Sequence, residues 1–304
     1  MGIKILNKKN INHNSTNGTK KLSTNGTKKL YIPEKNTISK SVVSFSSEDI
    51  VPLPPKVCDG KNECCILCHW GMGDQIIING LVRFLANTKF KRVHVLVPNS
   101  HGRHKVSNDR IRSVIRMYKD CRKINVFGEQ YLNSFREENS ELSIVNIRCG
   151  KTSHLDFTLY KMANVPLEER WNSWYLERNV RDKMREVKLF RELNLPNEYI
   201  FVHDSYSGGP SNLRISSKLP IVRPYIAETI FDWIRVIERA KEIHCVYSSF
   251  FNFVNSLDHL NSELYFHNSI SRRANCKPYF NKSQKWNVVN YVHPKKKKKK
   301  RRKR

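Results

Sequence analysis

The chain has 304 residues, of which 39% are apolar and 10% aromatic, so it can bury a core and is not disordered throughout. Its net charge of +28 is unevenly placed: residues 295–304 contribute +10 and residues 1–56 contribute +7, which leaves +11 for the body between them. A basic body of this kind suits an anionic ligand or surface, such as a nucleotide diphosphate, a nucleic acid or an anionic lipid.

The cysteines and the apolar segments indicate the compartment. The eight cysteines include adjacent Cys64 and Cys65 in an apolar run and lack the spaced framework of a small secreted domain, so we expect reduced, buried thiols. No apolar run approaches the roughly 20 residues that span a bilayer, and the first residues contain no secretory h-region. We therefore predict a cytoplasmic protein, with membrane-surface association or nuclear import through the basic tail as alternatives.

Both ends of the chain are of low complexity. Residues 1–56 are rich in Asn, Ser, Thr and Lys and repeat Ser-Thr-Asn-Gly-Thr-Lys-Lys-Leu at 15–22 and 23–30, too short a repeat for a solenoid. We predict a disordered N-terminal extension. The polybasic tail, residues 294–304, is expected to stay solvated and could contact an anionic membrane or nucleic acid.

Strand and helix patterns alternate between the two ends. After an apolar run at 64–68, the composition predicts further strands at 92–97, 123–127, 142–147, 199–204 and 243–247, and a last one at 263–266. Helical patterns cover 76–85, 108–118, 154–163, 179–193, 228–240 and 249–255. This alternation predicts an α/β fold with two Rossmann-like domains facing across a cleft, at 57–178 and 195–293, joined by an exposed connector helix at 179–194.

Cysteine and histidine cluster at the first strand. Cys65-Ile-Leu-Cys68-His69 matches the Cys-x-x-Cys-His pattern of covalent haem attachment, and Cys58, Cys64, Cys65 and Cys68 could be zinc ligands. Haem attachment requires export, however, and the zinc hypothesis lacks two clean Cys-x-x-Cys pairs. We favour buried core cysteines.

A glycine turn follows that strand. Gly71-Met-Gly73-Asp74 leads into a helix, where free backbone N–H groups meet the carboxyl edge of a sheet. It is not a full dinucleotide fingerprint, because Ile76 occupies the third glycine position. Asp74 either faces the cleft as an ionised carboxylate or caps the helix through the N–H groups of Ile76 or Ile77.

Two further polar loops follow predicted strands of the second half. The first contains His203, Asp204, a pair of glycines and Arg214, whose planar guanidinium suits a phosphate. The second contains Ser248 and Ser249, where hydroxyls and free N–H groups open a helix. An ordinary surface loop and a plain N-cap are the alternatives at these two places.

The three stretches together resemble a known family. Trp-Gly-Met-Gly-Asp-Gln followed by an apolar helix resembles the first motif of glycosyltransferases with two Rossmann-like domains (the GT-B type), especially lipopolysaccharide heptosyltransferases and related little-studied sugar transferases. The two later loops resemble the nucleotide-sugar domain of the same group. The resemblance implies that Asp74 is the general base and that Gly71, Gly73, His203, Asp204, Arg214, Ser248 and Ser249 bind substrate or donor. Residues 168–171, Glu-Glu-Arg-Trp, recur between the domains of that group, and we expect no role for them beyond domain packing.

The predicted function is therefore transfer of a sugar from a nucleotide-diphosphate donor to a hydroxyl acceptor on a glycan, a lipid-linked molecule or a protein. The nucleotide sugar is a co-substrate, so we expect no cofactor, and no Asp-x-Asp motif lies in a suitable loop to call for a metal. The alternatives are a non-catalytic protein that binds nucleic acid or another polyanion through its basic ends, and a degenerate transferase scaffold.

Overall fold

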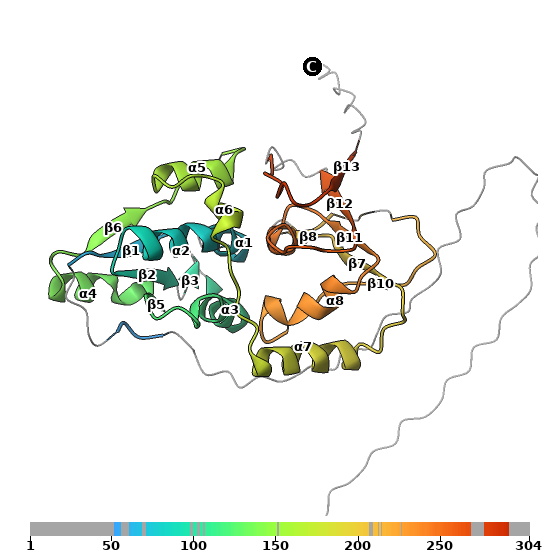
Figure 1. Cartoon of the computed structure of the whole chain (residues 1–304), viewed down its shortest axis with the longest axis horizontal. Coiled ribbons are helices and arrows are strands. Elements are labelled where there is room, and N and C mark those ends of the chain that lie inside the picture. Colours follow the sequence, from blue (N-terminus) through green and yellow to red (C-terminus); the bar gives the residue numbers. More distant parts are fainter. Residues whose placement is uncertain are drawn as a thin grey trace, which may run out of the picture. The chain divides into compact units, whose positions relative to one another are not determined.

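The computed structural model (Figure 1) describes most of the chain from the first predicted strand onward. The described residues are 52–55, 61–68, 71–97, 100–101, 104–105, 107–150, 152–206, 209–211, 213, 215–225, 227–268 and 277–291. They all belong to one compact unit. The predicted N-terminal extension, apart from 52–55, and the polybasic tail lie outside the described residues, as do Cys58, His69 and Arg214.

The first sheet is parallel and has the strand order β5-β2-β1-β6. The chain starts in a central strand, steps outward twice, and then returns to pair a fourth strand on the other side of the first. The point where the order reverses therefore lies between β1 and β6, as in a Rossmann half. The strands are β1 (Glu63–Leu67), β2 (Arg92–Val97), β5 (Ile124–Gly128) and β6 (Ser143–Asn146).

The second sheet is also parallel, with the order β10-β7-β11-β12-β13. Here the chain goes from β7 to one side and then crosses to the other, so the order reverses between β7 and β11. The strands are β7 (Ile200–His203), β10 (Ile221–Val222), β11 (Glu242–Cys245), β12 (Glu263–Asn268) and β13 (Trp286–Asn290).

Helices lie in most of the crossover connections between the parallel strands; among the described residues, the connection from β7 to β10 contains none. Two antiparallel ladders, β3 (Ser100–His101) with β4 (His104–Lys105) and β8 (Ser205–Tyr206) with β9 (Gly209–Pro210), lie in the connections. The helices are α1 (Met72–Ile77), α2 (Asn79–Thr88), α3 (Asn108–Tyr118), η1 (Glu129–Tyr131), α4 (Leu132–Glu138), α5 (Leu155–Met162), α6 (Glu169–Asn172), α7 (Val180–Glu192), η2 (Ile230–Trp233), α8 (Ile234–Glu238) and α9 (Ser249–Val254).

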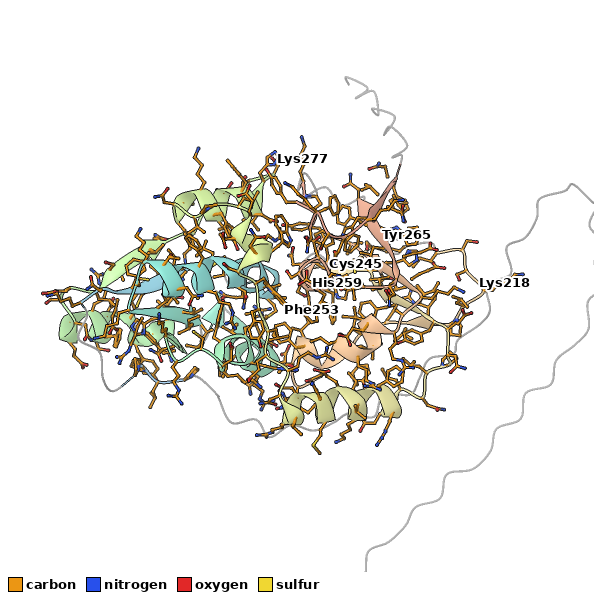
Figure 2. All side chains as sticks on the ribbon, viewed as in Figure 1. Lys218, Cys245, Phe253, His259, Tyr265 and Lys277 are labelled. Atoms are coloured by element: carbon orange, nitrogen blue, oxygen red, sulfur yellow. The ribbon has the colours of Figure 1, made fainter. Side chains whose placement is uncertain are left out.

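The core forms on both faces of the first sheet. Because successive side chains of a strand point to opposite faces, Cys64 joins the large apolar cluster on the side of α2, whereas Cys65 joins a smaller cluster with Phe135 of α4. The large cluster continues into the second sheet and the helix after β11, where Cys245 of β11 and Phe253 of α9 are fully buried. Lys218, in the connection before β10, is exposed (Figure 2).

Most predicted elements form within a residue or two of their expected bounds, but several expectations need correction. The single helix expected at 76–85 is instead two consecutive helices, α1 and α2, of which the first begins at Met72. Residues 263–266 are not the last strand, because β13 pairs in parallel with β12. The predicted helix at 228–240 is instead a 3₁₀ turn, η2, followed by the short helix α8. The two-residue strand β10 was not predicted at all.

A further correction concerns α7, which we expected to be an exposed connector because charges occur on nearly every turn. Asp182 and Glu186 are in fact buried, and both form ion pairs with the buried Arg116 of α3. A buried charge has to be paired, so Asp182 and Glu186 face inward, whereas Lys183, Lys188 and Glu192 of the same helix face solvent.

The α/β class with parallel sheets is confirmed. The predicted domain boundaries remain predictions. Among the described residues, no helix combines the length and apolarity needed to cross a membrane.

Candidate functional site

The reversal point of the second sheet carries two of the predicted motifs. His203 is the last residue of β7, and it is paired in register with Cys245, the last residue of β11. Ser248 follows β11 and is the N-cap of α9. In open parallel sheets, ligands bind outside the carboxyl ends of the strands at such a reversal point.

His203 and Ser248 are joined across this point. The His203 Nδ1 atom lies 2.9 Å from the Ser248 Oγ atom. Ser248 Oγ already accepts the N–H of Phe251 at 3.3 Å, so its own hydrogen is available to His203 Nδ1. Burial lowers the pKa of His203 to about 4, so the ring is uncharged at neutral pH. In the tautomer whose Nδ1 accepts the Ser248 hydroxyl, Nε2–H is the ring's donor.

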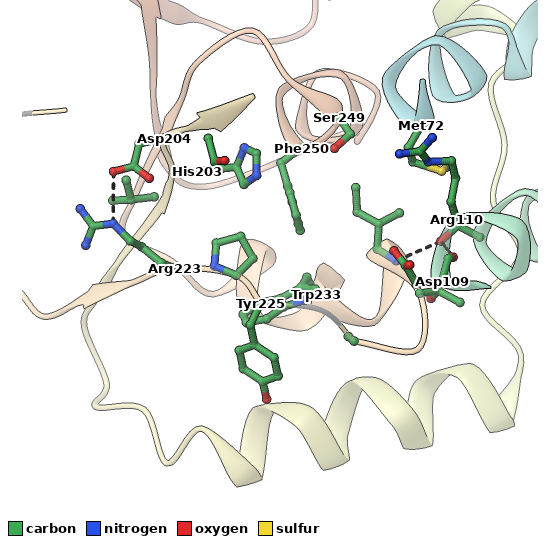
Figure 3. A pocket seen from close by; sticks show the side chains of 17 residues that line it. Met72, Asp109, Arg110, His203, Asp204, Arg223, Tyr225, Trp233, Ser249 and Phe250 are labelled. Atoms are coloured by element: carbon green, nitrogen blue, oxygen red, sulfur yellow. Dashed lines mark hydrogen bonds and ion pairs between the residues drawn. The ribbon is translucent and has the colours of Figure 1, made fainter. Parts of the chain in front are cut away.

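A pocket opens beside this pair (Figure 3). Its volume is about 370 Å³, within the usual range for small-molecule sites. Both halves of the described chain line it. The lining residues from α1 and α3 are Met72, Asp109, Arg110 and Ser113, and those from the second half are Val202, His203, Asp204, Ser205, Arg223, Pro224, Tyr225, Ala227, Thr229, Ile230, Trp233, Ser249 and Phe250.

Charged side chains lie on opposite sides of the pocket. Arg223 Nε donates to Asp204 Oδ2 at 3.2 Å, and about half of the Arg223 side chain is exposed. Asp109 and Arg110 lie across from that pair, at the start of α3 (Figure 3). The pocket thus presents a planar cation suited to phosphate next to hydrogen-bond acceptors suited to hydroxyl or amino groups.

Aromatic rings form the apolar wall. The Tyr225 ring meets Trp233 edge to face at 5.2 Å between centroids, and the Phe250 ring lies 4.7 Å from the His203 ring. Trp233 is fully buried, whereas Tyr225 is exposed at the rim. Such a wall can accommodate the flat face of a nucleobase or a sugar ring.

The glycine turn of the first half lies next to the second motif. A Cβ atom on Gly73 would lie 2.9 Å from Asn252 Nδ2 and 3.5 Å from the Ser249 Cα atom. A side chain at position 73 would therefore require the Asn252 amide to shift, so glycine favours this approach of α1 to α9.

Asp74 has a local role in this turn. Its Oδ2 atom accepts the N–H of Gly71 at 3.2 Å, so it closes the first turn of α1 from the third helical position. This differs from the expected cap through Ile76 or Ile77. Asp74 does not line the pocket, although the neighbouring Met72 does.

Several predicted site residues therefore come together in space. His203 is within hydrogen-bond distance of Ser248, Gly73 lies close to Ser249, and the pocket includes His203, Asp204 and Ser249. Gly71 and Asp74 are not among the residues that line the pocket. Asp74 is in α1, and Gly71 is the N-cap of that helix. Arg214 lies outside the described residues.

The prediction missed Asp109, Arg110, Arg223, Tyr225, Trp233 and Phe250. Arg223 and Tyr225 follow the carboxyl end of β10, which is the expected place for polar ligand-binding residues. Because β10 has only two residues, the sequence pattern did not reveal it as a strand, and so the loop that follows it was not recognised as a place for ligand-binding residues. The first turn of α3 comes after β2 and would have indicated Asp109 by the same rule.

The cysteine cluster is structural. Cys64 and Cys65 point to opposite faces of β1, so a single zinc ion cannot bind both. Burial raises the pKa of Cys64 to about 12, which keeps it a thiol. The described residues contain no group of three or more His, Cys, Asp or Glu placed to hold a metal ion.

No protein-family model matches the chain, and no curated protein matches it. Among solved structures, the chain is similar to the glycosyl transferase family 9 protein of Veillonella parvula DSM 2008, with a TM-score of 0.49 and 7% sequence identity over 79% of this chain and 90% of that chain. A likeness at this level assigns neither a family nor an activity.

Proposed function

We propose that this protein is a glycosyltransferase that moves a sugar from a nucleotide-diphosphate donor to a hydroxyl acceptor without a metal ion. The observation that supports the proposal is the meeting of three separate motifs: Gly73 lies close to Ser249, and the neighbouring Ser248 is within hydrogen-bond distance of His203. The pocket beside them has a volume suited to a small molecule and lies at the reversal point of a parallel sheet.

In the proposed mechanism, the donor's diphosphate binds beside Ser248, Ser249 and the Nε2–H of His203. Arg223, and Arg214 as the sequence suggests, neutralise the charge that develops on the leaving phosphate. Asp74 takes the proton of the acceptor hydroxyl. The hydroxyl oxygen then bonds to the anomeric carbon while the bond to the phosphate oxygen breaks and the nucleoside diphosphate leaves with the electron pair.

The experiment is a panel of nucleotide sugars incubated with the purified protein, with released nucleoside diphosphate as the readout. We expect release from one donor class and thermal stabilisation by the matching nucleoside diphosphate. An Arg223→Gln variant should lose most of the stabilisation, whereas Lys188→Gln, on the exposed face of α7, should keep it. Absence of stabilisation by every nucleoside diphosphate, together with absence of release, would refute the proposal.

A second candidate, binding of nucleic acid or another polyanion, is favoured by one feature of the sequence, the run of Lys and Arg at 295–304. Deletion of this run removes ten charges that would displace counterions from a phosphate backbone, so polyanion affinity and its salt dependence should both fall. Nucleoside diphosphate binding should survive the deletion. If both kinds of binding disappear together, the transferase pocket is not an independent site.

A further inference from the structure

Arg170 is a fully buried cation in the segment 168–171, for which the sequence suggested packing alone. Its guanidinium is 0% exposed and forms an ion pair with Asp156 of α5, which is 1% exposed. Arg170 Nη2 also donates to Asn252 Oδ1 in α9 at 3.1 Å. Burial lowers the pKa of Arg170 to about 10, which still leaves it charged at neutral pH. A buried charge of this kind is costly unless its partners hold it in place.

The partners of Arg170 flank the serine turn of the candidate site. Asp156 Oδ1 accepts the hydroxyl of Tyr247 at 3.3 Å, immediately before Ser248. Asn252 lies on the other side, and its N–H donates to the Ser248 carbonyl oxygen at 3.1 Å. Both ends of the turn at 247–252 are therefore connected to one guanidinium.

The same segment is pressed against the first half of the chain. A Cβ atom on Gly80 of α2 would lie 2.0 Å from the carbonyl oxygen of Glu169, so α2 and α6 are in direct backbone contact. The amide of Asn252 in turn lies against Gly73 of α1. Arg170 thus links a backbone held by α2 to the turn that carries Ser248 and Ser249.

We propose that Arg170 is a positioning residue: through Asp156 and Asn252 it holds the turn at 247–252 against α1, and so sets the place of Ser248 relative to His203. The part of this inference that concerns nucleotide binding rests on the proposed function. Its structural part, the ordering of the turn, is measurable without any nucleotide.

The test separates positioning from stability. Arg170→Met alone leaves Asp156 charged and buried, so the variant should be strongly destabilised. Arg170→Met combined with Asp156→Asn removes both charges and keeps an oxygen for the Tyr247 hydroxyl. We expect the double variant to regain most of the urea midpoint of the wild type. Its affinity for the nucleoside diphosphate should remain at least about tenfold weaker, and amide exchange at residues 249–252 should remain faster.

Arg83 and Asp120 provide a matched control. They form another Arg–Asp pair, with a buried Arg83 of α2 and a partly buried Asp120 after α3, and 2.8 Å between Nη2 and Oδ1. Arg83→Met combined with Asp120→Asn should leave both nucleotide affinity and exchange at 249–252 unchanged. Asn252→Ala keeps the Arg170–Asp156 pair and removes the amide that joins Arg170 to the turn and lies against Gly73, so it should also weaken binding and speed exchange.

Recovery of stability, affinity and exchange protection together in the Arg170 double variant would overturn the inference, as would wild-type behaviour of Asn252→Ala. If the wild type binds no nucleoside diphosphate, the proposed function fails, and the exchange rates alone decide whether Arg170 orders the turn.

Discussion

At the scale of single residues, the proposal depends most on Asp74, whose carboxylate has two separable tasks. It accepts the Gly71 N–H in the structure, and it is the proposed base for the acceptor hydroxyl. An asparagine can perform the first task through its amide oxygen but not the second, because an amide takes up no proton at neutral pH.

We therefore expect Asp74→Asn to lower the turnover rate by about 10²- to 10⁴-fold and to leave nucleoside diphosphate affinity and the melting temperature near those of the wild type. Steady-state kinetics and a thermal shift assay on the same preparation measure these quantities. Asp74→Ala should lose turnover and some stability together. Unchanged turnover in Asp74→Asn would assign the carboxylate to capping alone.

His203 makes stability depend on pH in a defined direction. Its pKa falls from 6.5 to about 4 on folding because the ring is buried. Between these values the unfolded chain binds a proton that the folded chain does not bind, so the free energy of unfolding decreases as the pH falls through this window.

Urea unfolding of the wild type and of His203→Gln, compared from about pH 7 down to about pH 4.5, should show a smaller loss of stability in the variant. His259→Asn is the control, because His259 is exposed and asparagine tolerates its positive φ of 53°. Equal pH dependence of His203→Gln and the wild type would show that His203 does not titrate differently on folding.

At the scale of elements, the contact between α2 and α6 is limited by backbone geometry. Gly80 lies inside α2, where glycine is a poor helix former and alanine normally adds about 1 kcal/mol of stability. The Glu169 carbonyl oxygen occupies the place of a Cβ atom, however, at 2.0 Å. Close packing therefore outweighs helix propensity at this position.

Gly80→Ala should consequently destabilise the protein by about 1–3 kcal/mol instead of stabilising it. Gly150→Ala is the matched control, since no atom lies within 4 Å of the added methyl group, and it should leave the unfolding midpoint unchanged. Chemical denaturation of the three proteins distinguishes these cases. A stabilised Gly80→Ala variant would mean that α2 and α6 can separate freely.

At the scale of the whole molecule, a buried cluster of charges connects the helices of the two sheets. Arg116 of α3 donates to Asp232 Oδ1 of η2 at 2.6 Å and to Glu186 Oε1 of α7 at 3.1 Å. Asp182 is also paired with Arg116 and additionally with Lys119. Removal of this buried cation leaves the three buried carboxylates paired only with the partly exposed Lys119, Arg178 and Arg185.

Arg116→Ala should therefore lower the free energy of unfolding by about 3–5 kcal/mol, with the greatest loss at neutral pH, where the carboxylates are ionised. Lys188→Ala removes an exposed partner of Glu192 on α7 and should have no measurable effect. Urea unfolding provides the measurement. A mild effect of Arg116→Ala would indicate that water enters the cluster and solvates the acids.

Much of this architecture could be predicted from local sequence. The apolar runs that became β1, β2 and β7 and the helical pattern of α3 are local signals, because strand and helix periods depend on neighbouring residues. The order of these elements predicted two parallel sheets. The polar loops after β7 and β11 were predicted for the same reason, since a ligand site lies at the carboxyl edge of such strands.

Long-range contacts decided the rest. β13 is an edge strand of modest hydrophobicity, and only its pairing with β12 identifies it. From the sequence alone, Asp182 and Glu186 of α7 were expected to be solvated. Only the tertiary structure shows that they pair with Arg116, which lies in a helix far away in the sequence. Likewise, the proposed positioning role of Arg170 follows only from its contacts with Asp156 and Asn252. The sequence by itself determined the parallel α/β fold and the candidate turns, whereas tertiary packing decided which side chains meet, because burial makes each charge depend on distant partners.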